Sequence, residues 1–498
     1  MMKRIAFVGL WTALGWSADW DLAAQRGAEA DRAFTAAQKQ LHGWLRHADP
    51  KTLLLPDRLG QTVYTPHNSA ADNYPYLILA AWFTDRELFA GRMMDMLRHE
   101  IRYTNTAGTQ IPGNYDFATG VLGKPSLFGA GEYAKDGLTP VTEWLGESPW
   151  YYRMLDMMRD VRQRAPRDNG AELDGDFMQA LFRLAPMSGD RDLLAWSREI
   201  SNYYLREVLP RNEFLPHTRL RDHGNEAIVG LVLLHALYSE MGLEGTEQDR
   251  AVIRRMLDRV LASANADGML FNDVRQTDQR LSDNWGYVYS AIYAFYQLTG
   301  EERWREAARK VLANLPRYRS YDWERGSMDG YADTIEGALY LVNREPVPEA
   351  LDWIESEMRI LFGYQKPDGV LERWYGDGNF TRTALLYALM KTQGCSVEGW
   401  RPGVELGAAR EGDRLLVSIR SATPWSGKLR FDWARHNRIL HLKKNYARLN
   451  EWPEWFTVDE NRLYRIQTAG GGEDVRLGSE LKTGIAVRSG MRLTVSPL

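Results

Sequence analysis

The chain has 498 residues and a formal net charge of −4, so it lacks the basic excess that nucleic-acid-binding proteins use. Hydrophobic residues make up 44% and charged residues 26%, which is ordinary globular composition and excludes a largely disordered chain. The one cysteine, Cys395, excludes an internal disulfide and a zinc site of the CxxC type. The 18 tryptophans outnumber the 15 phenylalanines, and the flat face and polar edge of Trp suit sugar recognition as well as core packing.

The N-terminus starts with Met-Met-Lys-Arg, and an apolar run follows from Ile5 to Ala18. A basic start, a short apolar stretch and small residues near Ser17 are typical of a secretory signal peptide, although a buried first helix would give the same run. The run is too short to span a bilayer. We therefore expect residues 1–18 to be a signal peptide, and export without disulfides fits a bacterial periplasmic or secreted protein.

From about residue 20 to 394 the chain repeats a unit in which a polar loop leads into an apolar helix, and a one-sided helix follows. The apolar helices are predicted at 72–83, 176–182, 225–237, 283–295, 333–341 and 379–389. One-sided helices, with apolar residues at helical spacing, are predicted around 253–261 and 304–312. A helix that is apolar on every side must be buried, whereas a helix with one apolar stripe lies outside it.

This alternation predicts a mainly α fold over residues 19–394, an (α/α)6 toroid of six helical hairpins with an inner and an outer ring. An open solenoid is the alternative. Closure is favoured because the inner helices carry little polar surface, and because the outer helix at about 20–47 has no inner partner until the ring closes. Residues 103–173 are too many for a turn, so we expect an insertion that forms a lid or wall of the site.

The C-terminal part of the chain changes character. Short alternating runs, separated by Gly, Pro and Asp, predict strands at 414–420, 427–432, 462–466, 484–488 and 491–495. They indicate a small antiparallel β-sandwich over residues 400–498.

The inner helices of such a toroid begin on the same side, so their first residues should gather at one mouth. The residues expected to act in catalysis are Glu226, Asp283, Asp333, Glu336 and His223. Those expected to bind substrate are His67, Asn68, Asp72, Asn73, Arg219, Asn225, Asn284, Trp285, Tyr331, Arg373, Trp374 and Tyr375. Carboxylates, a few basic groups and aromatic rings that converge on one place suit carbohydrate chemistry.

Each of these residues also has a structural interpretation. Asp and Asn are preferred helix N-caps, and Asp333 with Glu336 has the spacing of a capping box. Trp285, Trp374 and Tyr375 could equally belong to the core. Glu226 and Glu336 are less easily explained in this way, because buried carboxylates are rare unless they are paired or used.

A glycosidase needs two carboxyl groups, one to protonate the leaving oxygen and one to activate water or attack the sugar. Asp333 and Glu336 lie one turn apart on a helix, which is too close to flank a bond from opposite sides. A better pair takes one carboxylate from the side of Glu226 and one from Asp283, Asp333 or Glu336. The chain has no HExxH, GxxxxGK[ST] or GxSxG motif, and we expect no metal and no cofactor.

Three segments carry a resemblance to a known family: residues 67–76, residues 329–338 and residues 451–458. They are similar to glycoside hydrolase family 154, a family of β-glucuronidases. The resemblance implies exo-acting release of glucuronic acid from glycans, and it assigns no catalytic residue. Arginine and histidine at the mouth (Arg219, His223 and Arg373) would suit a uronate carboxylate, since Arg binds carboxylates bidentately.

Two alternatives stay open. Polysaccharide lyases resemble these toroids in outline but eliminate instead of hydrolysing, and a lyase set could come from His67, Asn68, Tyr74, His223, Asn225 and Tyr287. The other alternative is a non-catalytic glycan-binding protein. The substrate partner expected in each case is an oligo- or polysaccharide that contains uronic acid.

Overall fold

The computed structural model describes residues 15–498 except 213, 216–218, 222–223, 244 and 373–374. The chain forms two compact units. The helical unit contains Ala36–Leu386 together with Arg435–Pro453. The strand-rich unit contains Tyr387–Ala434, Glu454–Leu498 and the described residues up to Thr35.

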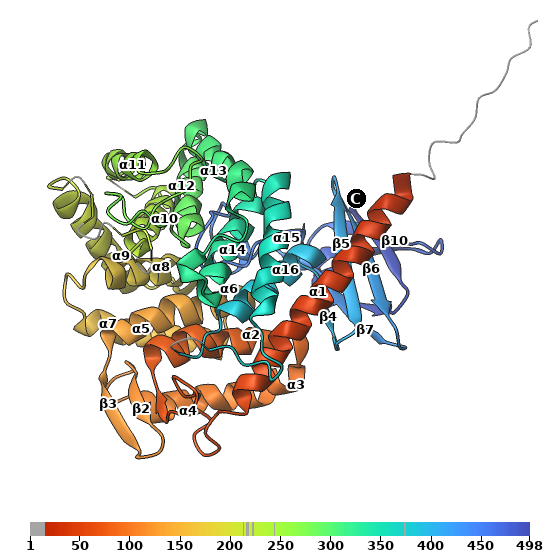
Figure 1. The fold of residues 1–498 in the computed structure, drawn as a ribbon, viewed down its shortest axis with the longest axis horizontal. Coiled ribbons are helices and arrows are strands. Elements are labelled where there is room, and N and C mark those ends of the chain that lie inside the picture. Colours follow the sequence, from red (N-terminus) through yellow and green to blue (C-terminus); the bar gives the residue numbers. More distant parts are fainter. Residues whose placement is uncertain (1–14, 213, 216–218, 222–223, 244, 373–374) are drawn as a thin grey trace, which may run out of the picture. The chain divides into compact units, whose positions relative to one another are not determined.

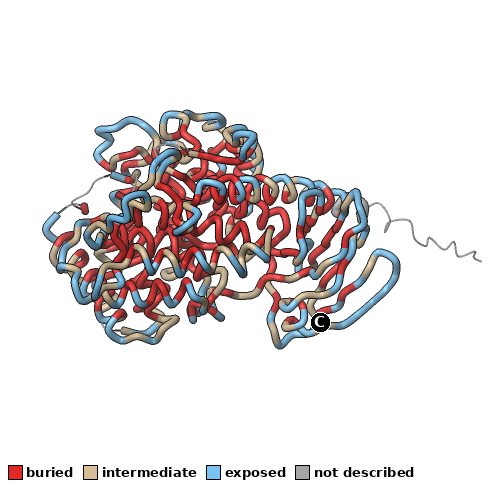
Figure 2. The backbone as a smooth tube through the Cα atoms, turned by 90° about the horizontal axis from the view of Figure 1, so that it is seen from below, coloured by how far each residue is buried: buried red, intermediate tan, exposed pale blue. Residues whose placement is uncertain are grey.

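Six apolar helices lie where the sequence predicts them. They are α2 (Tyr74–Thr84), α8 (Ala171–Ser188), α10 (Glu226–Glu240), α12 (Trp285–Thr299), α14 (Met328–Val342) and α16 (Asn379–Thr392). Helix α10 has buried residues from Glu226 to Tyr238 without a gap, as expected for a helix that is apolar on all sides. Buried residues fill the interior of the helical part of the molecule, and exposed residues lie at its periphery (Figure 2).

The longer helices between them are one-sided. They are α1 (Gly15–Leu45), α4 (Met94–Thr104), α7 (Pro149–Arg164), α9 (Arg191–Asn202), α11 (Thr246–Ala262), α13 (Glu302–Asn314) and α15 (Pro348–Gly363). Helix α9 buries Leu193, Trp196 and Ile200 along one stripe and exposes much of its other face. The expected alternation of inner and outer helices is therefore present.

The inner helices close into a ring. Helix α10 packs between α8 and α12, and α12 packs on α14 (Figure 1). The Thr383 hydroxyl in α16 donates to the Ala332 carbonyl of α14 over 3.1 Å. The Gly378 N–H, just before α16, donates to the Asp72 carbonyl over 3.0 Å, next to α2. The toroid of helical hairpins is confirmed.

The segment expected as a lid contributes to this ring. Three consecutive pieces, α5 (Leu127–Glu132), η3 (Tyr133–Leu138) and α6 (Thr139–Leu145), contact both α2 and α8. With α7 they make a further hairpin, so the described inner ring has seven members where the sequence suggested six. The buried charges Lys135 and Asp136 and the glycines beside them lower the apolar content of this segment. The hydrophobic pattern of the sequence therefore does not predict it as an inner helix.

The rest of that segment is a small sheet and a turn. Strand β2 (Gly113–Asp116) pairs antiparallel with β1 (Val63–Tyr64) and with β3 (Val121–Pro125).

The shorter helical elements are α3 (Arg86–Leu88), α17 (Arg435–Arg438), α18 (Gly478–Thr483), η1 (Pro66–Asn73), η2 (Phe89–Met93), η4 (Tyr203–Val208), η5 (Leu315–Tyr318) and η6 (Trp323–Arg325).

Glycines let the inner helices approach one another closely. A Cβ atom on Gly286 of α12 would lie 2.4 Å from the Cα of Gly337 in α14. A Cβ atom on Gly175 of α8 would lie 2.4 Å from the carbonyl carbon of Glu226 in α10. No side chain fits at either contact. The close approach brings the polar first turns of neighbouring helices within hydrogen-bonding reach.

The strand-rich unit has two antiparallel sheets and a short parallel pair. One sheet has the order β11-β10-β13-β6-β5 and the other the order β12-β7-β4. Their bounds are β4 (Ser396–Glu398), β5 (Val404–Glu411), β6 (Arg414–Ser421), β7 (Ser426–Arg430), β10 (Leu463–Thr468), β11 (Glu473–Leu477), β12 (Ile485–Arg488) and β13 (Arg492–Pro497). Strand β8 (Asp432–Trp433) pairs in parallel with β9 (Thr457–Val458). A strand lies at each of the five positions predicted from sequence.

Residues 435–453 belong with the helices, although the sequence placed them in the β region. Arg448 donates to both oxygens of Glu143 in α6 over 2.6 and 2.9 Å. Arg183 of α8 donates to the same carboxylate over 2.9 Å, and the side chains of Glu143, Arg183 and Arg448 are all at most 2% exposed. We call this stretch the inserted segment. No helix of the described chain combines the length and the apolar character needed to cross a membrane.

The Glu143 carboxylate should be a main support of the helical unit. Burial would raise the pKa of Glu143, but Arg448 and Arg183 lower it below its usual value, so the group stays ionised. Glu143→Gln should lower the free energy of unfolding by about 3–5 kcal/mol, because it removes the charged carboxylate that two buried guanidinium groups share. Chemical denaturation would measure this loss.

The matched control is the exposed pair Arg98–Asp95, which is joined over 2.6 Å at the surface. Arg98→Ala should change stability by no more than about 1 kcal/mol. Equal effects of the two variants would contradict the role assigned to Glu143.

Candidate active site

The polar residues at the starts of the inner helices turn into the ring instead of capping the helices. Asn225 and Asn284 occupy the N-cap positions of α10 and α12, and neither side chain makes a capping hydrogen bond. The Asn284 amide instead donates to Asp333 in α14 over 2.9 Å. Helix α14 begins at Met328 and is capped by Ser327, so the capping-box interpretation of Asp333 and Glu336 is wrong.

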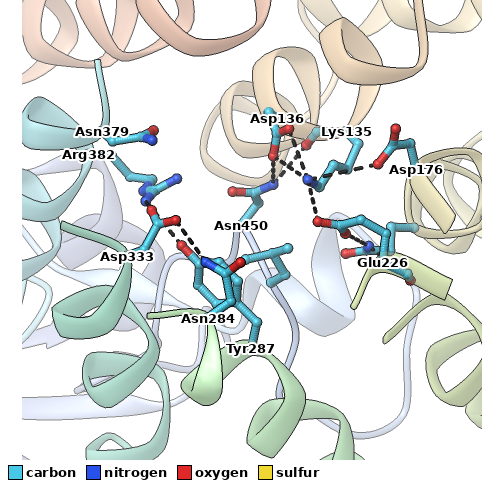
Figure 3. A network of polar contacts seen from close by, with 12 residues as sticks. Lys135, Asp136, Asp176, Glu226, Asn284, Tyr287, Asp333, Asn379, Arg382 and Asn450 are labelled. Carbon is cyan, nitrogen blue, oxygen red and sulfur yellow. Dashed lines mark hydrogen bonds and ion pairs between the residues drawn. The ribbon is translucent and has the colours of Figure 1, made fainter. Parts of the chain in front are cut away.

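Arg382 organises one cluster of these residues, which we call the Arg382 cluster (Figure 3). Its Nη2 atom lies 2.6 Å from Asp333 Oδ1 and 2.6 Å from Glu336 Oε2. The hydroxyl of Tyr287 donates to Glu336 over 2.5 Å, and Tyr340 also donates to Glu336. Burial alone would lower the pKa of Arg382, but Glu336 and the other acidic neighbours raise it well above its usual value.

The carboxyl groups around Arg382 differ in their surroundings. Asp333 retains 15% of its side-chain surface, whereas Glu336 is fully buried. Burial raises the pKa of Glu336 to about 7, although Arg382 opposes the shift. Burial also raises the pKa of Asp377 to about 7. Asp333 therefore lies partly accessible beside two buried acids whose pKa values are raised.

Lys135 organises a second cluster, which we call the Lys135 cluster (Figure 3). Its ammonium lies 2.8 Å from Asp136, 2.8 Å from Glu226 and 3.8 Å from Asp176. Gln179 of α8 also donates to Glu226. Burial alone would lower the pKa of Lys135, but Asp136, Glu226 and Asp176 raise it well above its usual value, so the ammonium stays charged.

The pKa of Asp72, which lies on η1, depends on charged groups in both clusters. Burial raises its pKa well above the usual value, Asp136 and Asp377 raise it further, and Lys135 and Arg382 oppose the shift. Asp72 still keeps part of its surface accessible, as do Asp333 and Tyr375. The ring interior thus holds two partly accessible carboxyl groups, Asp72 with a raised pKa and Asp333 in contact with Arg382.

Other predicted residues also lie in or beside this region. Asp283 is buried, and its Oδ1 lies 3.9 Å from Arg221 Nε. Asn73 and Asn225 are fully buried, and no described group forms a hydrogen bond with either side-chain amide. Burial and the charges of Asp72, Asp329 and Asp377 raise the pKa of Tyr375, which places this tyrosine near the carboxylates.

Four predicted binding residues have other surroundings. Trp285 is fully buried and donates to Thr334 over 2.6 Å, so it packs α12 on α14 and has no face for a sugar. Tyr331 is 5% exposed and lies against Tyr364 beside α15. Asn68 donates to Asp57 over 2.8 Å. Arg219 is exposed and forms a backbone bridge with Asp273. The arginine that approaches Asp283 is Arg221, two positions further on.

His67 is half-buried on η1, next to the ring of Phe128, and burial lowers its pKa. His223, Arg373 and Trp374 lie outside the residues that the structure describes.

The residues that sequence reasoning missed are Lys135 and its neighbour Asp136. The sequence pattern predicts a loop where Lys135 and Asp136 lie. The feature that could have indicated their role is a pair of charged residues inside the otherwise apolar stretch 133–138. Arg382 was visible as a charge in the first turn of an apolar helix. In the described part of the chain, no three His, Cys, Asp or Glu side chains are grouped so as to hold a metal ion.

Comparisons with known proteins bear on the fold only. No protein-family model matches the chain, and no curated protein matches it. An unsaturated glucuronyl hydrolase from Bacillus sp. GL1 has 13% identity and a TM-score of 0.39, with 57% of this chain and 88% of that chain covered. The cellobiose 2-epimerase of Spirochaeta thermophila has 12% identity and a TM-score of 0.40, with 76% and 98% covered.

A family 76 glycoside hydrolase from a Bacteroides thetaiotaomicron strain has 13% identity and a TM-score of 0.37, with 53% of this chain and 68% of that chain covered. Likenesses of this size carry no argument about the site. Its chemistry has to be inferred from the residues themselves.

The buried Glu336 should give the protein a distinctive pH dependence of stability. Its pKa is raised from the ordinary value of 4.5 to about 7 by folding, so its contribution is fully present below about pH 4.5 and is lost as the pH rises through 7. The free energy of unfolding of wild type, relative to Glu336→Gln, should therefore fall by about 3 kcal/mol between these pH values. Denaturant titrations at a series of pH values would measure this difference. A constant difference across this range would show that Glu336 is ionised throughout.

Proposed function

We propose that the protein is a glycoside hydrolase that acts on glycans containing uronic acid. The observation that carries the proposal is that Asp72 and Asp333 come from different elements and both interact with Arg382 inside the ring. Burial and the neighbouring Asp136 raise the pKa of Asp72, while Arg382 and Asn284 donate hydrogen bonds to Asp333. Glycoside hydrolysis requires one acid and one base or nucleophile in different states of protonation.

In this proposal Asp72 gives its proton to the oxygen of the leaving sugar. Asp333 activates water or attacks the anomeric carbon, and Arg382 holds its carboxylate through a hydrogen bond of 2.6 Å. The two carboxyl groups come from different inner elements, η1 and α14, as a pair that flanks a bond requires. Glu226, paired with Lys135, supports the wall beside Asp72.

The finer assignment is exo-acting release of glucuronic acid. It rests on the resemblance of residues 67–76, 329–338 and 451–458 to glycoside hydrolase family 154. Asp72 lies in the first of these segments and Asp333 in the second. The N-terminal pattern supports the further proposal that the protein is periplasmic or secreted.

The lyase alternative has weaker support. A lyase needs a tyrosine or histidine that accepts a proton. Burial raises the pKa of Tyr287 well above its usual value, and its hydroxyl already donates to Glu336. Tyr74 is buried, donates to the Met93 carbonyl over 2.7 Å and has a raised pKa for the same reason.

Incubation with glucuronate-capped oligosaccharides tests the function. Wild type should release free glucuronic acid without any rise in ultraviolet absorbance. Asp333→Asn and Asp72→Asn should each lower kcat/KM by about 100-fold or more, because each removes one proton-transfer group. Chromatography of the products and steady-state kinetics would measure both results.

Asp174→Asn is the matched control. Asp174 also lies near the start of an inner helix, but it accepts hydrogen bonds from Asn169 and Tyr204. Its kcat/KM should stay within a few fold of wild type. An unsaturated product would indicate a lyase, and full activity in both site variants would reject the pair.

A further inference from the structure

The Lys135 cluster contains a residue from a distant part of the chain. Asn450 belongs to the inserted segment, and its side chain points at Lys135 and Asp136 (Figure 3). Its amide nitrogen donates to Asp136 Oδ1 over 3.0 Å and to the Lys135 carbonyl over 3.0 Å. One amide group therefore holds both the backbone and the carboxylate of this pair.

The backbone at Asn450 is shaped for this contact. Its φ angle is +59°, in the left-handed region that Asn tolerates better than most residues. The side chain is 2% exposed, and its Oδ1 atom has no hydrogen bond to any described group. Asn450 thus buries a polar atom without a partner while its amide nitrogen makes both bonds, which makes simple packing a poor explanation of its presence.

Its neighbours in the inserted segment fix this geometry. Arg448 is joined to Glu143, as described above. Glu451 accepts from Arg344 over 2.5 and 2.8 Å, and its side chain has no exposed surface. The Trp452 indole donates to the Pro140 carbonyl over 2.9 Å. The backbone on both sides of Asn450 is therefore fixed by these contacts.

We propose that Asn450 is a positioning residue for Asp72, and that it acts by fixing the Lys135–Asp136 ion pair beside that acid. The proposal rests on the proposed function, because it takes Asp72 as the proton donor. Asp72 and Asp136 lie on η1 and η3, which pack on each other; after burial, Asp136 is the neighbour that raises the pKa of Asp72 most, and Lys135 opposes it. The bond from Asn450 to Asp136 Oδ1 holds that carboxyl group, and the bond to the Lys135 carbonyl holds the backbone between the two charged groups.

The other charged groups that act on Asp72 come from other elements. Asp377 favours its protonated form, and Arg382 of α16 opposes it. Glu132 of α5 and Tyr375 are also coupled to it. None of these groups receives a hydrogen bond from Asn450 in the described structure, so a variant of Asn450 changes the Asp136 side of this balance alone.

Asn450→Gly tests the proposal, because glycine accepts the left-handed backbone and removes the side chain together with its amide donor. Without the donor, the negative charge on Asp136 is less stable and Lys135 is freer to approach Asp72. Asp72 should then lose its proton more easily. The high-pH limb of the kcat/KM profile, where the acid deprotonates, should move down by about one pH unit.

The control is Asn437→Ala, which truncates an exposed amide in the same segment that donates only to the Leu442 carbonyl over 3.2 Å. Its profile should match that of wild type. If the pH profile of kcat/KM for Asn450→Gly also matches that of wild type, Asn450 has only a structural role and the proposal is overturned. This holds whether or not the melting temperature falls.

A second readout needs no substrate. The infrared band of the protonated carboxyl group that disappears in Asp72→Asn reports the titration of Asp72. Its loss with rising pH should occur about one pH unit lower in Asn450→Gly than in wild type. An unmoved band overturns the positioning role even if no glycan is cleaved, whereas a moved band with no release of uronic acid rejects only the proposed function.

Discussion

Buried charges in this ring are stable only where an opposite charge and hydrogen bonds meet them, and this requirement shapes the helical unit. Arg382 lies between Asp333 and Glu336, Lys135 between Asp136 and Glu226, and Glu143 between Arg183 and Arg448. Each group comes from a different element from at least one of its partners. The inner helices must therefore stand at fixed heights relative to one another, because a shift of one turn would leave several charges unpaired at once.

The same requirement explains how neighbouring carboxyl groups come to differ. Where a guanidinium and an amide both reach an accessible carboxylate, as at Asp333, the charge is supported directly. Where a carboxyl group lies in a desolvated environment beside another acid, as at Asp72 beside Asp136, its pKa is raised. Two chemically identical aspartate side chains thus have different electrostatic environments because their neighbouring groups differ.

Sequence patterns predict most of this architecture. Apolar helices are visible by composition, and the six predicted ones exist because burial selects for side chains that are apolar on every face. The segment 127–145 escaped because Lys135, Asp136 and several glycines lowered its apolar content. The mouth was predictable as a set of polar helix starts. Which residues touch was not, because contacts such as Asn284 with Asp333 depend on the relative heights of two helices.

Asn450 marks the limit of such prediction. Its neighbours in the chain gave strand-like and loop-like signals, and nothing local indicates that Lys135, 315 positions earlier, is its partner. Trp285 shows the opposite error. An aromatic residue at a helix start looked available to a ligand, but the close approach of Gly286 to Gly337 draws α12 and α14 together and encloses its ring.

The position of the inserted segment has a consequence for the synthesis of the protein. Glu143, Arg344 and Lys135 leave the ribosome well before residues 448–451, which complete their hydrogen bonds. During translation the nascent ring therefore holds buried charges that lack part of their final environment. These contacts form only after residues 448–451 have been synthesised, so the helical unit cannot finish folding one hairpin at a time as an ordinary repeat array can.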